Sequence, residues 1–368
     1  MAAPMGAPVL NGSDRSLEEL VDSWDGEATV MRRARSTDAL ITIGVHSTAL
    51  GPAAGGCRMR TYRSSAAAVE DAHRLATAMT SKLAVCGLPF GGGKAVLAVP
   101  SIPEGDARRD LLLELGELVE SLGGLYITAP DMNTSDVDMD VVAERTSHVF
   151  CRTAESGGCG NPAPATAAGV EAGLRAAIAH VFGSDDLDGR RVLVQGVGAV
   201  GERLARRLTD DGADVVVCDI DEQRADHLAR RIGVRAIPAA AWLDEECDVF
   251  APCAAGGILD EGTIPRLRCR LVAGAANNQL RERADADRLA ARGITWVPDY
   301  VLNSGGVLKG VGMELLHWPP EEVANRLQQV GEDVASLLRR ADTEGQTPLA
   351  VAETLASDRI DAARATRV

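Results

Sequence analysis

Hydrophobic and polar positions along the chain follow two different periods, and each period predicts one kind of element. Residues 24–48 alternate between apolar and polar types and are rich in Val, Ile and Thr, which predicts the strands of an opening sheet. Residues 64–84 instead place apolar side chains at helical spacing behind a serine that can cap a helix. Residues 1 to about 20 mix small and polar types, so we expect them to be loosely ordered.

Predicted strands and helices alternate up to residue 150, and this alternation ends at a passage rich in Gly, Pro and Ala. This passage, residues 156–170, is the best candidate for a domain boundary or hinge. Before it, the pattern predicts a strand at 95–100 directly after a run of glycines, a helix at 106–123, a strand from 125 that ends at Asp131, and a helix at 135–149.

The second half of the chain contains the glycine spacing of a dinucleotide-binding loop. Gly196-x-Gly198-x-x-Gly201 stands between a strand predicted at 191–195 and a helix, and the next strand ends at Asp219. In such a loop the first glycine makes the turn, the second lets the pyrophosphate approach the helix N-terminus, and the third allows close helix–strand packing. Asp219 suits a hydrogen bond to the ribose hydroxyls and would repel a 2′-phosphate, which favours NAD over NADP.

Further strand-like pieces follow this loop at βαβ spacing, and each ends in small or polar residues, as expected at the carboxyl edge of a parallel sheet. Helical sequence closes the chain from about Pro320. The pattern therefore predicts an α/β protein of two domains, residues 1–150 and a Rossmann-type dinucleotide-binding domain at 151–340. A final helix at about 340–368 is expected to pack back on the first domain.

Composition favours a small-molecule enzyme over a nucleic-acid or membrane protein. The 368 residues are 46% hydrophobic and 25% charged, and the net charge of −15 disfavours anionic partners such as nucleic acid or a membrane surface. No apolar run suits a membrane helix and the N-terminus lacks a secretory signal, so we expect a cytoplasmic protein. The eight cysteines lack the paired spacing of a zinc or dithiol site, so we expect reduced cysteines and no metal.

Candidate chemistry gathers in the segment Lys82–Lys94, KLAVCGLPFGGGK. Its two lysines lie among apolar residues and glycines, an environment in which one lysine can act as a base while the other stays charged and binds an anion. A glycine-rich surface turn with two solvated lysines is the alternative. A Walker-type phosphate loop is excluded, because Leu88 stands where that motif has its first glycine and Ala95 where it has Ser or Thr.

Several other glycine and polar residues can be interpreted either as turn residues or as residues of a functional site. The pair Gly55-Gly56 either frees the backbone to approach a ligand or makes a turn. Asp131, at the end of a strand and beside a proline, is either a turn former or the counter-charge of the lysine pair. Asn277 and Asn303 are either turn residues or ligand-binding residues.

Taken together, these residues resemble the amino acid dehydrogenases of the glutamate/leucine/phenylalanine/valine family. The resemblance runs from Trp24 to the C-terminus and rests on LGPAAGGCRM, GLPFGGGK, YITAPDMNT, QGVGAVG, APCAAGG, VAGAANNQL and PDYVLNSGG. The phenylalanine branch is the most similar, through LGPAAGG, the Pro130 before Asp131, and VGMELLHW. The family implies an N-terminal α/β substrate and oligomerisation domain with a mixed sheet, a Rossmann-type domain, and an active-site cleft between them.

The resemblance also implies the reaction, a reversible NAD-dependent oxidative deamination of an L-amino acid to a 2-oxo acid and ammonia in a homo-oligomer. Lys82, helped by Gly56, would bind the substrate carboxylate. Lys94 would activate the attacking water, and Asp131 would shuttle protons to and from the amino group. The remaining implied contacts are Asn277, Val307 and Gly310 for the substrate, and Gly196, Gly198, Ala199, Val200, Gly201, Asp219, Thr166, Cys253, Ala254, Asn277 and Asn303 for the cofactor.

Substrate choice is where the chain departs from the family pattern. Gly310 stands where a larger apolar residue is expected, Val307 is bulkier than the expected alanine, and GNPAPAT is similar to the leucine branch. A glycine at a pocket wall favours a bulky side chain, so we expect an aromatic substrate, phenylalanine before tryptophan. The alternatives are a branched-chain (leucine/valine) dehydrogenase and an inactive NAD-binding regulatory paralogue. The presence of Lys82, Lys94 and Asp131 argues against the paralogue.

Overall fold

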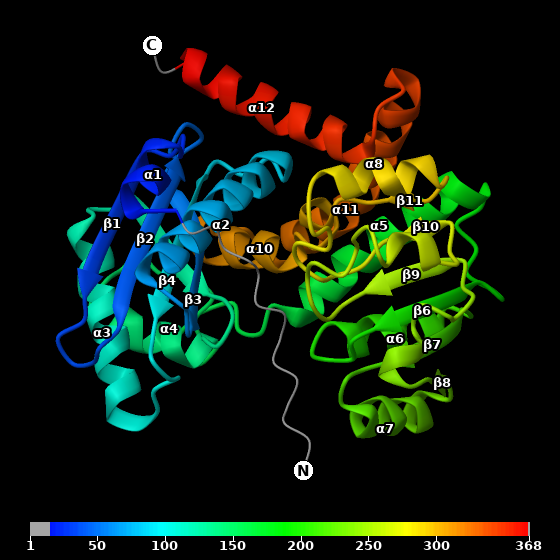
Figure 1. The fold of residues 1–368 in the computed structure, drawn as a ribbon, viewed down its shortest axis with the longest axis horizontal. Helices are drawn as coiled ribbons and strands as arrows, with labels where there is room; N and C mark the ends of the chain where they lie inside the picture. The colour runs from blue at the N-terminus through cyan, green and yellow to red at the C-terminus, as the bar shows by residue number, and fades with distance from the viewer. Residues whose placement is uncertain (1–14, 367–368) are drawn as a thin grey trace. The chain divides into compact units, whose positions relative to one another are not determined.

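The computed structural model describes residues 15–366. Within this range the chain forms two compact units, each with its own sheet (Figure 1). The N-terminal unit consists of the residues up to 83 together with 89–152, and the C-terminal unit of residues 84–88 together with 153 onward. No helix of the described residues is long and apolar enough to cross a membrane.

A short helix, α1 (Leu17–Asp22), opens the described chain. The side chain of Ser16 accepts a hydrogen bond from the backbone of Glu19, and the Glu19 carboxylate accepts one from the backbone of Ser16, so the two residues form a capping box. The expectation of loose order is therefore wrong from Ser16 onward. The rest of that expectation, for residues 1–14, lies outside the described residues.

The sheet of the N-terminal unit is mixed, as the family resemblance implies. Its order is β1-β2-β4-β3-β5, in which β2 pairs antiparallel with β1 and β4, and β3 pairs parallel with β4 and β5. The position of β3 between β4 and β5 places its side chains beside those of two neighbouring strands. The strands are β1 (Ala28–Arg33), β2 (Leu40–Ser47), β3 (Ala53–Arg60), β4 (Gly91–Ala98) and β5 (Tyr126–Pro130).

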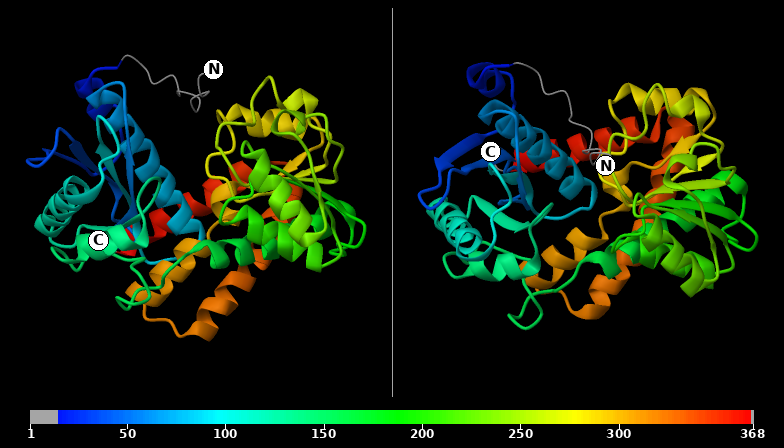
Figure 2. Two further views of the ribbon diagram at one scale, coloured as in Figure 1. Left: turned by 90° about the horizontal axis from the view of Figure 1, so that it is seen from below. Right: turned by 60° about the horizontal axis from the view of Figure 1, so that its bottom comes forward.

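Helices cover both faces of this sheet (Figures 1 and 2). Ile41 and Leu97 of the sheet share one apolar core with residues of α3 and α4. Val96, which points to the opposite face because side chains alternate along a strand, packs against Ala72 of α2. The predicted helices of the first half are thus present as α2 (Ser65–Val85), α3 (Gly105–Ser121) and α4 (Asp136–Ala143).

The glycine run Gly91–Gly93 belongs to β4, which corrects the prediction of a strand that starts after the glycines. A Cβ at Gly92 would lie 2.1 Å from the backbone nitrogen of Thr80 in α2. A Cβ at Gly55 would lie 1.9 Å from the carbonyl oxygen of Gly93. Glycine is required here because helix and strands approach more closely than any side chain allows. The glycine pair of β3 likewise lies in a strand and makes no turn.

The sheet of the C-terminal unit has the order β11-β10-β9-β6-β7-β8, and all its neighbouring strands are parallel. The strand order reverses at β6, which has β7 on one side and β9 on the other. Ligands of such sheets bind beyond the carboxyl ends of the strands at this reversal. The strands are β6 (Arg191–Gln195), β7 (Asp214–Cys218), β8 (Arg235–Ala236), β9 (Val249–Pro252), β10 (Leu271–Val272) and β11 (Thr295–Trp296).

The helices of this unit begin inside the passage predicted as a domain boundary. α5 starts at Ala163 behind Pro162, because a proline is well tolerated in the first turn of a helix and the following alanines favour helix. The helices are α5 (Ala163–Phe182), α6 (Gly201–Asp210), α7 (Glu222–Ile232), α8 (Ala284–Ala291), α9 (Asp299–Leu302), α10 (Gly305–Gly310), a π-helical turn η3 (Val311–Leu315), α11 (Pro320–Glu344) and α12 (Pro348–Thr366).

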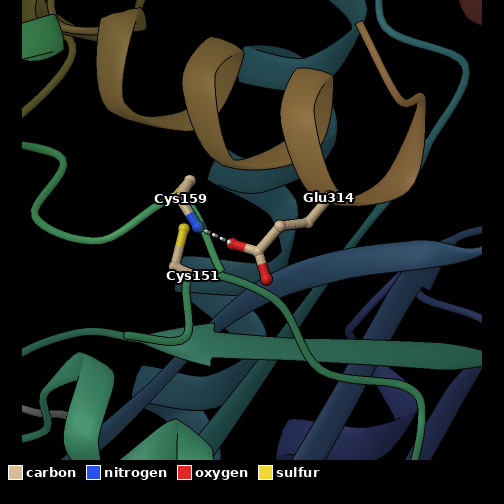
Figure 3. Close-up of side chains that lie close together, drawn as sticks. All are labelled: Cys151, Cys159 and Glu314. Carbon is tan, nitrogen blue, oxygen red and sulfur yellow. Dashed lines mark hydrogen bonds between the residues drawn. The ribbon is translucent and has the colours of Figure 1, made fainter. Parts of the chain in front are cut away.

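Two long-range contacts tie the segments of the C-terminal unit together. The backbone N–H of Cys159 donates to Oε1 of Glu314 in the π-helical turn, at 2.8 Å (Figure 3). Arg359 of α12 donates from Nη1 to the carbonyl oxygens of Ala84 and Val85, each at 2.6 Å. The two bonds from Arg359 connect the short segment 84–88 to the rest of this unit.

Gly92→Ala is expected to destabilise the N-terminal unit, because the added methyl group would overlap the backbone of α2. Overpacking of this kind costs about 1–3 kcal/mol. Thermal unfolding followed by circular dichroism measures the effect. Gly262→Ala is the control, since a Cβ at that position meets its nearest atom only at 3.5 Å. An unchanged unfolding temperature for Gly92→Ala would show that α2 and β4 are not packed this closely.

Candidate active site

Strand register brings two predicted site residues of the N-terminal unit to one level of the sheet. Cys57 of β3 is paired with Ala95 of β4 and with Pro130 of β5. Lys94 directly precedes Ala95, and Asp131 directly follows Pro130. Residues that are far apart in sequence therefore meet around the middle of β3.

Lys94 and Asp131 form a buried ion pair. Nζ of Lys94 lies 3.0 Å from Oδ2 of Asp131, and Lys94 is only 5% exposed. A tight turn holds the carboxylate, because the N–H of Asp131 donates to Thr134 (2.8 Å) and the Thr134 hydroxyl donates to the carbonyl oxygen of Cys57 (2.7 Å). The alternative of a solvated surface lysine is therefore wrong for Lys94. Asp131 is both the first residue of a turn and a counter-charge.

Arg58 completes this group, and sequence reasoning missed it. Its Nε donates to Oδ2 of Asp131 at 2.9 Å, and its Nη1 donates to Oδ2 of Asp71 at 3.3 Å. The sequence held one signal: a cation inside a strand of small and apolar residues, two positions after Gly56 and so on the same face of β3.

Electrostatics keep the Asp131 carboxylate ionised. Burial alone would raise its pKa, but the charges of Lys94 and Arg58 outweigh burial and hold the pKa of Asp131 well below its usual range. Burial raises the pKa of the neighbouring Cys57 thiol, so this cysteine stays protonated. The site therefore presents one fixed negative charge between two cations.

Gly56 lies directly against Asp131, and Lys82 lies at the end of α2. A Cβ at Gly56 would lie 2.7 Å from the carbonyl oxygen of Pro130 and 2.9 Å from Cβ of Asp131, so any side chain there would displace the carboxylate. Lys82 lies half-buried in the last turn of α2. The close packing of α2 on β4 involves Thr80, two residues before this lysine.

The glycine-rich loop of the C-terminal unit has the geometry that a pyrophosphate requires. Gly196 has φ 93°, and a Cβ there would lie 2.5 Å from Cβ of Ala254. A Cβ at Gly201 would lie 1.9 Å from the carbonyl oxygen of Gly196 and 3.0 Å from Cβ of Cys253. At Gly198, in contrast, a Cβ would meet no described atom within 4 Å. The first and third glycines are needed for packing, and the second faces open space.

Asp219 holds this loop in place. Its Oδ2 accepts a hydrogen bond from the backbone N–H of Val197, inside the loop, at 2.8 Å, and its Oδ1 accepts one from Asp221 at 2.9 Å. The residue is 8% exposed. Arg224, which sequence reasoning did not consider, places Nη1 3.9 Å from Oδ2 of Asp219. The acid therefore shapes the loop in addition to any contact with a ribose.

The predicted amide and hydroxyl residues of the C-terminal unit lie in two groups. Nδ2 of Asn303 donates to Oδ1 of Asn277 at 2.8 Å, which joins the two predicted asparagines. The Thr166 hydroxyl donates to the carbonyl oxygen of Pro162 (3.1 Å), and a Cβ at Gly306 would lie 2.8 Å from Oγ1 of Thr166. The starts of α5 and α10 are thus in contact. The other predicted residues are placed as follows: Ala199 and Val200 in the turn before α6, and Val307 and Gly310 on α10.

Lysine usage is a sequence signal that could have strengthened the site assignment. The chain has 38 Lys and Arg residues, of which only Lys82, Lys94 and Lys309 are lysines. An arginine cannot be deprotonated in a protein, whereas a lysine can exchange its proton. Two of the three lysines lie in the segment that carries the candidate chemistry.

Comparison with known proteins finds relatives over nearly the whole chain. Leucine dehydrogenase of Thermoactinomyces intermedius is 39% identical over 95% of this chain and 94% of that protein. Valine dehydrogenase of Streptomyces virginiae is 40% identical over 93% of this chain and 96% of that protein. These relatives do not single out an aromatic substrate.

A solved structure and family models agree with this result. The crystal structure of L-tryptophan dehydrogenase from Nostoc punctiforme matches with a TM-score of 0.79 and 34% identity, covering 95% of this chain and 99% of that chain. The model of the Glu/Leu/Phe/Val dehydrogenase dimerisation domain matches residues 32–148, and the model of Glutamate/Leucine/Phenylalanine/Valine dehydrogenase matches 157–225 and 217–367. The chain therefore belongs to the glutamate/leucine/phenylalanine/valine dehydrogenase family.

Proposed function

We propose that this protein catalyses the reversible NAD-dependent oxidative deamination of an L-amino acid to its 2-oxo acid and ammonia. The observation that carries the proposal is the buried contact between Lys94 and Asp131. Gly56 lies beside this pair, at a position where any side chain would displace the Asp131 carboxylate. Family membership supports an oxidoreductase acting on an amino acid. A regulatory paralogue without chemistry would have no need for a buried, paired lysine, which is costly to maintain.

The residues divide the chemistry as follows. Lys82 would bind the substrate carboxylate, and NAD, when bound, would supply the acceptor for the hydride of the substrate Cα. Asp131 takes a proton from the amino group and stabilises the cationic imino intermediate. Lys94 activates the water that adds to this intermediate after the lysine has released the proton that it carries in the ion pair. Because Nζ of Lys94 is 3.0 Å from Oδ2 of Asp131, the proton can pass directly between them and on to the departing ammonia.

The cofactor proposal rests on the glycine-rich loop and on Asp219. Gly198 leaves space for the pyrophosphate, while the side chain of Asp219 is positioned at the end of β7, where an adenosine ribose binds in sheets of this kind. A carboxylate there repels a 2′-phosphate. Thr166 and Asn303 would hold the nicotinamide carboxamide.

The substrate proposal is an aromatic L-amino acid, with phenylalanine favoured over tryptophan. It rests on Gly310, a small residue of α10 at a position where the family pattern has a larger apolar one. The similarity to a tryptophan dehydrogenase structure agrees with an aromatic substrate. The similarity to leucine and valine dehydrogenases favours the second candidate, a branched-chain amino acid dehydrogenase.

We also propose that the protein is a cytoplasmic homo-oligomer. One solved relative, from Thermus thermophilus, is described as a hetero-hexameric glutamate dehydrogenase.

Replacement of Lys94 should remove turnover and spare cofactor binding. Lys94→Ala and Lys94→Arg should each lower kcat by about 100- to 10,000-fold, because neither residue can act as a general base. Lys94→Arg keeps a cation beside Asp131 and so controls for the loss of charge. Isothermal titration calorimetry with NAD should give nearly the wild-type Kd for both variants. Near-normal kcat in either variant would contradict the assignment of the base.

Replacement of Asp219 should weaken NAD binding and narrow the preference for NAD over NADP. Asp219→Ala removes the anion that repels a 2′-phosphate and leaves Arg224 nearby as a possible phosphate partner. The measurement is kcat/KM for both cofactors. Glu222→Ala, which removes an exposed acid from the first turn of α7, is the charge-matched control. An unchanged cofactor ratio in Asp219→Ala would count against the ribose contact.

A spectrophotometric screen of NADH formation with the L-amino acids identifies the substrate. We expect the highest kcat/KM with phenylalanine or tryptophan. Gly310→Val should lower kcat/KM for the aromatic substrates more than for valine, because it narrows the proposed pocket. A higher kcat/KM for leucine or valine than for phenylalanine in the wild-type chain would select the branched-chain alternative. Turnover of no amino acid would select the regulatory paralogue.

A further inference from the structure

Arg58 is a buried cation that links two carboxylates. Its residue is 9% exposed in β3, and its guanidinium group reaches Asp131 through Nε (2.9 Å) and Asp71 through Nη1 (3.3 Å). A guanidinium group is planar, always charged and able to donate in several fixed directions, so it can hold two carboxylates in one geometry. Lysine, a single point charge on a flexible chain, cannot do this.

Asp71, the second partner, is itself anchored. The hydroxyl of Tyr62 donates to its Oδ2 at 2.7 Å, and Nη2 of Arg74 donates to its Oδ1 at 2.7 Å. Burial alone would raise the pKa of Asp71, but Arg74 and Arg58 lower it below its usual range, so this carboxylate remains charged. The far end of Arg58 is therefore fixed from α2 and from the segment that follows β3.

The contacts on Asp131 are one-sided. Nζ of Lys94 and Nε of Arg58 both lie on Oδ2, at 3.0 and 2.9 Å, and the described residues make no hydrogen bond to Oδ1. Asp131 keeps 22% of its side chain exposed, whereas Lys94 keeps 7%. Oδ1 is therefore the oxygen that a substrate can use.

We propose that Arg58 is a positioning residue for this reaction: supported by Asp71, it fixes Oδ2 of Asp131 against Lys94 and so presents Oδ1, ionised, to the substrate amino group. The inference rests on the proposed function, since it assigns a part to Arg58 in that same site. Arg58 itself touches neither substrate nor cofactor in this role. It acts through Asp131.

The pH dependence follows from the groups around Asp131. Lys94 reaches it from β4, Arg58 and the neutral thiol of Cys57 face it from β3, and the neutral phenol of Tyr126 faces it from β5. Asp71 of α2 is the only other charged partner of Arg58 among the described residues. Arg58 thus supplies one of two cations that lower the pKa of Asp131, and its removal raises that pKa. Protonation of Asp131 then occurs at higher pH than in the wild-type chain.

The test compares Arg58→Gln, Arg58→Lys and Asp71→Asn with the wild-type chain. Arg58→Gln should lower kcat by about 100-fold, the cost expected for a misplaced catalytic group, with a smaller effect on KM. The acidic limb of its kcat/KM profile should move to higher pH. Arg58→Lys should restore the position of this limb, because lysine returns the positive charge. It should restore only part of kcat, because an ammonium group lacks the planar guanidinium geometry that holds two carboxylates. Asp71→Asn keeps Arg58 and should give an intermediate kcat.

A matched control separates positioning from general damage. Arg32 is a partly buried arginine of the N-terminal unit that pairs with Glu114 and Glu117, and Arg32→Gln breaks these ion pairs. This variant should leave kcat and the pH profile unchanged. Unfolding temperatures of all variants report stability. If Arg58→Gln does not fold, Asp71→Asn and Arg58→Lys still decide the question through their kcat and pH profiles.

A second readout does not depend on activity. The chain has three lysines, so selective ¹³C labelling of lysine Cε gives three side-chain signals, and Lys94→Arg assigns the one of interest. The Lys94 signal should shift on acidification at a higher pH in Arg58→Gln than in wild type, as its partner Asp131 is protonated. Identical shifts in both chains, or an unmoved pH profile with normal kcat, would overturn the proposal. An inactive wild-type chain with the expected NMR shifts would instead overturn the proposed function alone.

Discussion

A lysine and a carboxylate can remain together away from water only if further groups satisfy their charges and hydrogen bonds, and the N-terminal unit is arranged around this constraint. Lys94 and Asp131 meet at 3.0 Å in a site formed by three strands. The strands and α2 approach closely because glycines occupy the positions where a Cβ would strike backbone atoms. The buried ion pair and the glycine-rich packing therefore depend on each other.

Charges of opposite sign alternate through this region. Lys94, Asp131, Arg58, Asp71 and Arg74 follow one another, so that each carboxylate lies between two cations. Such an arrangement offsets the desolvation of each charge with more than one partner, and it makes the loss of any single member costly. It also connects α2, β3 and β4 to the turn after β5, which gives the Asp131 carboxylate a fixed direction.

In the C-terminal unit, carboxylates also fix local structure, but they do so by accepting hydrogen bonds from backbone N–H groups. Asp219 accepts from the N–H of Val197 in the glycine-rich loop, and Asp299 accepts from the N–H of Asn278, which has φ 53°. A loop that is already fixed by such bonds loses less conformational entropy when a ligand binds. The glycine-rich loop is therefore held in one shape by the protein itself.

The sequence by itself determined the features that depend on local spacing: α2 from its apolar period, the mixture of strands and helices, the glycine fingerprint with Asp219, and Lys94 and Asp131 as candidates. These follow from backbone periodicity and from residue types with few roles, and both can be read within a short window. Only the tertiary structure decided that Gly91–Gly93 lie inside β4 and that Arg58 bridges Asp71 and Asp131. Arg58 and Asp131 are 73 positions apart, and their contact is created by the parallel pairing of β3 with β5. Strand register is a property of the folded sheet, and no local pattern in the sequence encodes which distant charge it will bring into contact.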